Sequence, residues 1–282
     1  MLYLSYNQYK AMSLANILSK KNRALMRELV VTDFKLRYQG SVLGYLWSLL
    51  KPLFMFAILY VVFGMFFKFG TGIDHYPVYL LLGVVLWGFF TEATSQGLTA
   101  IVGRGDLIRK INFPKYIIVI SGTVSALINM VLNLLVVLVF MVIGGVDIFH
   151  PTTLLFPLVV AELYVLALSL AFLLSAFYVR FRDIGHIWDI IMQAAFYLTP
   201  VLYLPTLVIA FSPLAAKLMF LNPVAQIIQD ARYTLVTHNT VTIHNFVQNG
   251  LIVALPFLIV LTTAIVAAWY LKKSAKYFAE NI

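Results

Sequence analysis

Polar side chains recur at helical spacing inside three long apolar stretches of the sequence. Steps of three and four residues put side chains on one face of a helix, so each set would form a polar face on an apolar helix. An acidic side chain at membrane depth is costly and usually faces a cavity or a partner, which makes Glu92 the most informative member. The sets are Gly88, Glu92, Ser95, Gln96 and Thr99; Ser121, Ser125, Asn129 and Asn133; and Asp189, Gln193 and Tyr197.

Such faces have two possible uses. They could line a polar path for a transported molecule, or they could hydrogen-bond neighbouring helices at about 0.6–2 kcal/mol per bond. For the ladder from Ser121 to Asn133 we favour hydrogen bonds between helices, whereas both interpretations stay open for Glu92. Aromatic rings inside the apolar runs, such as Phe54 and Tyr197, offer flat faces on which sugars can stack, although lipid-facing bulk is the commoner explanation for any one ring.

Patterns that would indicate an enzyme are absent from the sequence. It has no G-x-x-x-x-G-K-[ST] phosphate loop, no H-E-x-x-H pair and no cysteine, and its five histidines are scattered. His238 and His244 lie in a polar loop at a spacing that suits no standard metal site. A membrane-embedded glycosyl- or lipid-modifying enzyme would need clustered acidic or histidine residues, and we see none. We therefore expect no catalytic residue and no metal site in this chain.

The composition indicates an integral membrane protein. Of the 282 residues, 62% are hydrophobic and only 11% are charged, compared with about 45–50% and about 25% in soluble domains. A spanning helix needs about 20 apolar residues. Five segments qualify, a shorter sixth precedes a broken apolar piece at 206–221, and that piece is expected to form a re-entrant helical hairpin. The spans are expected at 47–69, 78–102, 116–144, 154–179, 187–204 and 250–271.

Lysine and arginine residues set the expected orientation, because they are enriched in cytoplasmic loops. Six spans would leave sixteen basic residues on the side of the termini and three on the other, so both termini are predicted to be cytoplasmic. The net charge of +9 therefore suits a membrane surface better than nucleic acid. Before the first span, Leu25, Leu29 and Phe34 alternate with basic residues, as do Leu14, Ile17 and Leu18, which is typical of an amphipathic interfacial helix.

Four segments in order resemble the membrane subunit of ABC exporters for cell-surface polysaccharides, a family that handles O-antigen, capsular, teichoic-acid and rhamnose-rich wall polymers. They are ELVVTDFKLRYQGSVLGYLWSLLKP (28–52), GRGDLIRKINFPK (103–115), FYVRFRDIGHIWDIIMQAAFYLTPVLY (177–203) and LNPVAQIIQDARY (221–233). The likeness runs from about residue 20 to the C-terminus. The sequence is most similar to the branch of the family that exports rhamnose-type wall polysaccharides.

The resemblance implies an all-α ABC-2 type exporter in the plasma (inner) membrane. We expect one transmembrane domain over 1–282, with an amphipathic region at 1–46, a six-span bundle at 47–271 and a cytoplasmic tail at 272–282. In this family two copies pair, and each docks a separate ATP-binding subunit. ATP and magnesium would then be bound by the partner and no cofactor by this chain, which explains the missing phosphate loop.

The resemblance also assigns roles to residues. Segment 103–115 matches the coupling helix that contacts the ATP-binding subunit, although alone it would pass for an ordinary basic loop. A polyprenyl pyrophosphate carrying the polysaccharide would bind near the first span, where Lys51 could instead simply extend to the interface. The expected residues are Arg104, Asp106, Leu107, Arg109 and Lys110 for coupling; Arg27, Lys35, Arg37, Trp47 and Lys51 for the lipid pyrophosphate; and Phe54, Glu92, Gln96, Gln193 and Tyr197 for the pore lining.

The function we predict is ATP-driven export of a lipid-linked polysaccharide by a homodimer with two ATP-binding subunits. The alternative is a proton-coupled lipid or oligosaccharide flippase that works without an ATPase. A proton relay would require a row of acidic residues, and the sequence has none, so this alternative is the weaker one.

Overall fold

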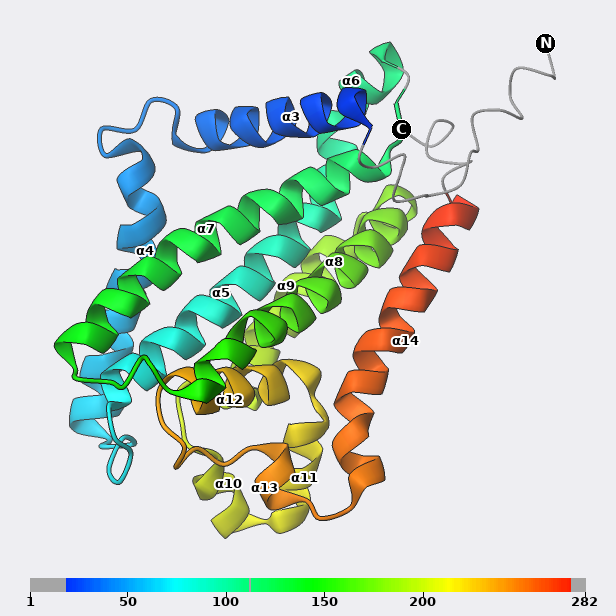
Figure 1. Ribbon diagram of the computed structural model, residues 1–282. Helices are drawn as coiled ribbons and strands as arrows, with labels where there is room; N and C mark the ends of the chain where they lie inside the picture. The colour runs from blue at the N-terminus through cyan, green and yellow to red at the C-terminus, as the bar shows by residue number, and fades with distance from the viewer. Residues whose placement is uncertain (1–18, 112, 275–282) are drawn as a thin grey trace.

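The long apolar runs fold as helices in this computed structural model, which describes residues 19–111 and 113–274 (Figure 1). Within these residues there is no strand, and five helical segments are long and apolar enough to cross a membrane. They confirm the five longer spans that the sequence predicts, with ends shifted by a few residues. The five segments are Gly44–Phe66, Tyr76–Ala100, Tyr116–Ile143, Pro151–Arg180 and Gly250–Tyr270.

Helix α5 (Tyr76–Ala100) lies at the centre of the bundle, between α7 (Tyr116–Ile143) and α8 (Phe156–Arg180). Of its most apolar window, 78% is buried, compared with 11% for the first segment and 17% for the last. A Cβ atom added to Gly97 would lie 2.2 Å from the Cβ of Ala171 in α8. A small residue at this crossing lets the two backbones approach closely, as is common between membrane helices.

The first and last spans lie outside this centre. The first begins as α4 (Trp47–Leu59), which contains Pro52, and continues as a wider π-helical segment, Tyr60–Phe66. Pro52 lies inside α4 and lacks the N–H that would bond the carbonyl of Ser48, four residues earlier, and that carbonyl accepts instead from the Asn133 amide of α7. The last span, α14 (Gly250–Ser274), runs beside α8 (Figure 1).

Two short elements and one longer helix cover one end of the bundle (Figure 1). Helix α3 (Lys20–Tyr38) lies across this end, and Ser19 caps it by accepting a hydrogen bond from the backbone N–H of Asn22. The 3-10 turn Val102–Arg104 and helix α6 (Gly105–Lys110) follow α5. Residues Leu14, Ile17 and Leu18, which we expected to belong to the amphipathic helix, lie outside the described residues.

The opposite end is built from short helices. Helix α9 (Ile184–Leu198) leads into α10 (Pro205–Phe211), α11 (Pro213–Leu221) and α12 (Pro223–Leu235), and α13 (Ile243–Phe246) precedes the last span. The predicted span 187–204 is wrong at its C-terminal end, because residues 199–204 are not helical. With 15 residues, α9 is about 22 Å long at 1.5 Å per residue.

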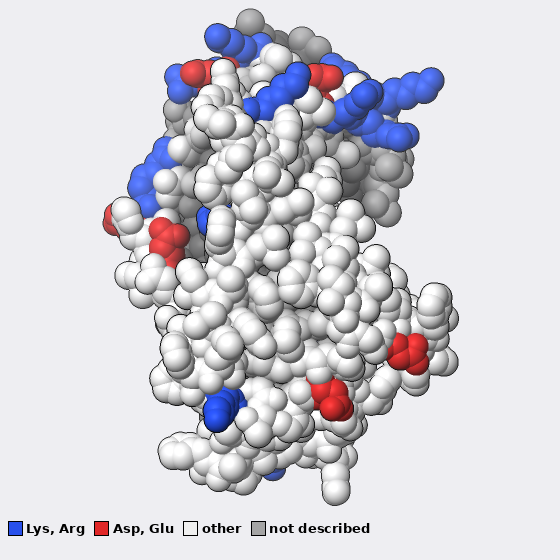
Figure 2. Space-filling view, turned by 90° about the vertical axis from the view of Figure 1, so that its left-hand side faces the viewer, with Lys and Arg blue, Asp and Glu red and all other residues white. Residues whose placement is uncertain are grey.

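The fold separates charge along the bundle. Figure 2 shows lysine and arginine gathered at the end that α3 and α6 cover, above a broad band without charges. Lys68 and Lys217 are exposed cations outside this group. An uncharged band between two polar ends is what a bilayer requires of a protein that crosses it.

Candidate functional site

Glu92 is held by side chains from three helices. The Arg37 guanidinium in α3 forms an ion pair with it, and the amide of Gln96, one turn along α5, donates to Oε1 at 2.8 Å. Asn129 in α7 donates to Oε2 at 2.7 Å. Hydrogen bonds to a charged acceptor are stronger than neutral ones, so this set of Arg37, Glu92, Gln96 and Asn129, called the Glu92 cluster below, ties α3, α5 and α7 together.

The polar stripe of α5 is also its most open face. Gly88 and Thr99 are exposed, and Glu92, Ser95 and Gln96 are half-buried, in a helix that is otherwise largely buried. The sequence prediction that these residues share one face is therefore confirmed. One side of Glu92 meets α7, and the other borders this open face. Glu92 can therefore both bond a neighbouring helix and line a polar path.

The ladder on α7 makes hydrogen bonds between helices, as the sequence favoured. Asn129 reaches Glu92, and Asn133 donates at 3.2 Å to the backbone oxygen of Ser48 in α4. Ser125 instead donates to the carbonyl of Ser121 in its own helix. The two asparagines thus fix α5 and α4 to α7.

A cleft of about 510 Å³ opens beside the Glu92 cluster, between α3, α5 and α7. This volume is within the range of small-ligand sites, which is about 300–1,000 Å³. Two arginines line it, and each forms an ion pair with an acidic residue: Arg37 with Glu92, and Arg104 with Asp33. The lining residues are Asp33, Leu36, Arg37, Gln96, Thr99, Ala100, Gly103, Arg104, Ile118 and Gly122.

The residues expected to bind the lipid pyrophosphate are spread over two helices. Arg37 lines the cleft, whereas Arg27 and Lys35 are exposed elsewhere on α3. Trp47 and Lys51 are exposed one turn apart on α4, as their spacing predicted. Of the five, Arg37 is the residue in the cleft.

The residues expected to contact an ATP-binding subunit divide into two groups. Asp106, Arg109 and Lys110 are exposed on α6. Arg104 and Leu107 turn inward: Arg104 bonds Asp33 and also donates to Ser121 Oγ at 3.0 Å, and Leu107 packs in an apolar cluster with residues of α3 and α7. Only the first group therefore presents its side chains outward.

The remaining residues expected to line a pore lie on open faces of two helices. Phe54 on α4 is 57% exposed. On α9, Asp189, Gln193 and Tyr197 are all exposed, while Trp188 and Met192 face the core. The four-residue spacing of Asp189, Gln193 and Tyr197 therefore does produce one outward polar face.

Arg232 has a structural role that the sequence analysis missed. Its side chain is fully buried and donates to three backbone carbonyls, those of Tyr79 at 3.0 Å, Pro200 at 2.6 Å and Val201 at 2.7 Å. The guanidinium also lies 3.7 Å from the centre of the Tyr79 ring. Arg232 thus holds the connection after α9 against α5 and α12. Its only signal in the sequence was a single arginine in an otherwise weakly charged region.

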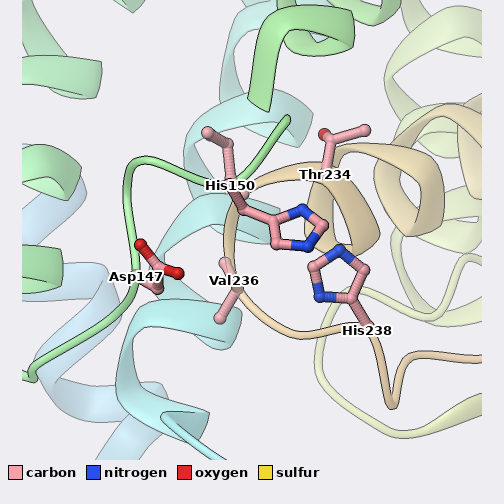
Figure 3. Close-up of a pocket in the computed structure, with 6 residues that line it drawn as sticks. Asp147, His150, Thr234, Val236 and His238 are labelled. Carbon is pink, nitrogen blue, oxygen red and sulfur yellow. The ribbon is translucent and has the colours of Figure 1, made fainter. Parts of the chain in front are cut away.

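Two histidines far apart in the sequence meet at the other end of the bundle (Figure 3). The rings of His150 and His238 are 4.1 Å apart, and the Thr152 hydroxyl contacts both, at 2.8 Å and 3.0 Å. They line a small pocket of about 90 Å³ with Asp147. Across the residues that the structure describes, no group of three histidine, cysteine or acidic side chains could hold a metal ion.

Comparison with known proteins agrees with this architecture. Residues 24–236 match the ABC-2 type transporter family. The O-antigen export system permease protein RfbA of Myxococcus xanthus is 33% identical over 206 residues, which cover 73% of this chain and 77% of the relative. A protein of the same name from Klebsiella pneumoniae is 26% identical over 215 residues, 72% of this chain and 82% of the relative. This multi-pass membrane protein belongs to the ABC-2 type transporter family.

Proposed function

We propose that this chain is the transmembrane subunit of an ATP-driven ABC transporter that exports a lipid-linked cell-surface polysaccharide. The family match and the two relatives named as O-antigen export permeases support this function. The sequence has no phosphate loop of its own, so the ATPase belongs on a separate subunit. The observation that carries the proposal is the match of residues 24–236 to the ABC-2 type transporter family, and the cleft beside Glu92 places two arginines next to the open polar face of α5.

The proposed assembly is a homodimer with two ATP-binding subunits in the plasma (inner) membrane. Helix α6 would bind the ATP-binding subunit through Asp106, Arg109 and Lys110, and ATP and magnesium would be held by that partner. Helix α9 would be the sixth crossing, α3 would lie at the cytoplasmic interface, and α10 and α11 would form the re-entrant hairpin. Both termini would then be cytoplasmic.

The polyprenyl pyrophosphate of the substrate would bind first in the cleft. A diphosphate matches the planar guanidinium of Arg37 and would compete with Glu92 for it. Arg27, Lys35 and Lys51 would raise the local concentration of the anionic lipid, and Trp47 would lie at the level of the headgroups. Glu92, Gln96, Phe54, Gln193 and Tyr197 would then line the path of the polymer, with aromatic rings against the sugars.

The experiment is reconstitution of the chain, with the ATP-binding subunit that co-purifies with it, into proteoliposomes containing a polyprenyl-pyrophosphate-linked oligosaccharide. We expect export of the sugar to require ATP. Transport that needs a proton gradient and no nucleotide would instead support the proton-coupled flippase. A chain that co-purifies with no ATP-binding subunit would also contradict the proposal.

A variant in the cleft tests the binding step. Arg37→Gln should bind the diphosphate lipid several-fold more weakly, because it loses the charged fork that matches phosphate. The matched control is Arg23→Gln, an exposed arginine on the same helix and outside the cleft. Equal affinity of the two variants for the lipid would contradict the role given to Arg37.

A further inference from the structure

Helix α3 is attached along one face to several parts of the protein. In its first half, Leu25, Met26 and Leu29 pack mainly against α7, in an apolar cluster that also includes Leu107 and Ile108 of α6. Farther along the same face, at steps of four residues from Leu29, come Asp33 and Arg37. Side chains at these steps share one helical face, so these attachments of α3 lie on the side that faces the bundle.

The two charged attachments lead in different directions. Asp33 forms an ion pair with Arg104, in the turn that directly precedes α6. Arg37 forms an ion pair with Glu92, in the middle of α5. The side chains of Asp33, Arg37, Glu92 and Arg104 are between 21% and 27% exposed, so water screens the two pairs only in part.

We propose that Asp33 is a positioning residue that makes α3 follow the movement of α6 and so transmits the state of the ATP-binding subunit to the Glu92 cluster. This inference rests on the proposed function, because it takes α6 as the contact of the ATP-binding subunit. The apolar cluster places α3 beside α7 and α6 without fixing the direction of any movement. The ion pair between Asp33 and Arg104 fixes the direction in which α3 moves when α6 moves. Arg37, one turn farther along α3, then transmits this movement to Glu92.

The same geometry explains why Arg104 turns inward while its neighbours on α6 face outward. Its guanidinium donates to Asp33 of α3 and to Ser121 of α7, so it connects the turn before α6 to both of these helices. An arginine can make both bonds because its donors are fixed in a planar fork. Asp106, Arg109 and Lys110 are left exposed for a partner.

Three variants and a control test the inference in the reconstituted complex. They are Asp33→Asn, Arg104→Gln, the charge swap Asp33→Arg with Arg104→Asp, and Glu28→Gln. Glu28 is an exposed acid on α3 that lies outside the cleft, so its change matches Asp33→Asn in charge and helix. For each, the co-purified ATP-binding subunit, the rate of ATP hydrolysis and the amount of sugar exported are measured.

We expect Asp33→Asn and Arg104→Gln to keep the complex and its ATP hydrolysis but to export several-fold less sugar per ATP. The charge swap should restore most of this ratio, because the ion pair is re-formed and an aspartate at 104 can accept from the Ser121 hydroxyl. Glu28→Gln should leave the ratio unchanged. A general loss of folding would lower ATP hydrolysis, export and assembly together and would not be rescued by the swap.

Two results would overturn the inference. One is an unchanged ratio of export to ATP hydrolysis in Asp33→Asn. The other is a swap that exports as little per ATP as the single variants while the complex remains intact. Either result leaves the proposed function in place, whereas a wild-type chain that neither binds an ATP-binding subunit nor exports with ATP contradicts the proposed function itself.

Discussion

At the scale of single residues, Arg232 is the largest fully buried side chain among the residues that the structure describes. A charged group is stable in a dry interior only when its donors are satisfied, and here three carbonyl oxygens satisfy them. Gly83 in α5 makes room for it, because a Cβ atom at this position would lie 2.3 Å from the Arg232 Nη2. Further bonds fix the same connection: the Tyr76 hydroxyl donates to the carbonyl of Leu202 at 3.0 Å.

Arg232→Met should lower the free energy of unfolding by roughly 3 kcal/mol or more, because each carbonyl left without its donor costs about 1–3 kcal/mol. Gly83→Ala should also destabilise the wild type, yet cost much less in the Arg232→Met background, where the guanidinium is gone. Thermal unfolding in detergent of the two single variants and the double variant measures this coupling. Strictly additive effects would contradict it, and Lys217→Met, at an exposed lysine, is the control.

At the scale of elements, the position of each long helix could be predicted from the sequence and the contacts between helices could not. Hydropathy located five spans because lipid demands about 20 apolar residues whatever the neighbours are. It failed after Leu198 because residues 199–204 are mostly apolar too, whereas Pro200 and the bonds from Arg232 and Tyr76 to backbone carbonyls hold them out of a helix. The ion pair between Arg37 and Glu92 joins residues that are 55 apart in the sequence. No repeating pattern of residues could have predicted this contact.

The crossing of α5 and α8 gives a prediction at this scale. Gly97→Val should lower the free energy of unfolding by about 1–3 kcal/mol, because the added atoms would overlap Ala171 and force the helices apart. Gly88→Val, on the same helix, is the matched control, because a Cβ atom there has no neighbour within 4 Å among the described residues. Thermal unfolding in detergent compares the two. Equal losses would mean that helix propensity, and not the crossing, explains the effect.

At the scale of the whole molecule, the two ends differ in charge and in build. Helices α3 and α6 cover the basic end, and short helices with the buried Arg232 form the other (Figures 1 and 2). This polarity predicts which end faces the cytoplasm, because positively charged segments are retained there. The prediction rests on charge placement alone and is independent of the family match.

The natural absence of cysteine makes this orientation easy to test. In intact cells or right-side-out vesicles, Lys217→Cys should react with a membrane-impermeant maleimide, whereas Lys21→Cys should react only after the membrane is opened. Both lysines are exposed in the folded chain, so accessibility in detergent is the control. Labelling of Lys21→Cys from outside would reverse the proposed orientation.

The junction between α3 and the first span contains two glycines in left-handed conformation, Gly40 at φ +77° and Gly44 at φ +50°, with open space around each. On one side of it α3 is clamped to the bundle, and on the other only 11% of the first span's window is buried. Glycine adopts these φ values at little cost, so the pair lets the chain turn from α3 into the first span without backbone strain. Any other residue at either position would strain the backbone of this turn and so disturb the angle between α3 and the first span.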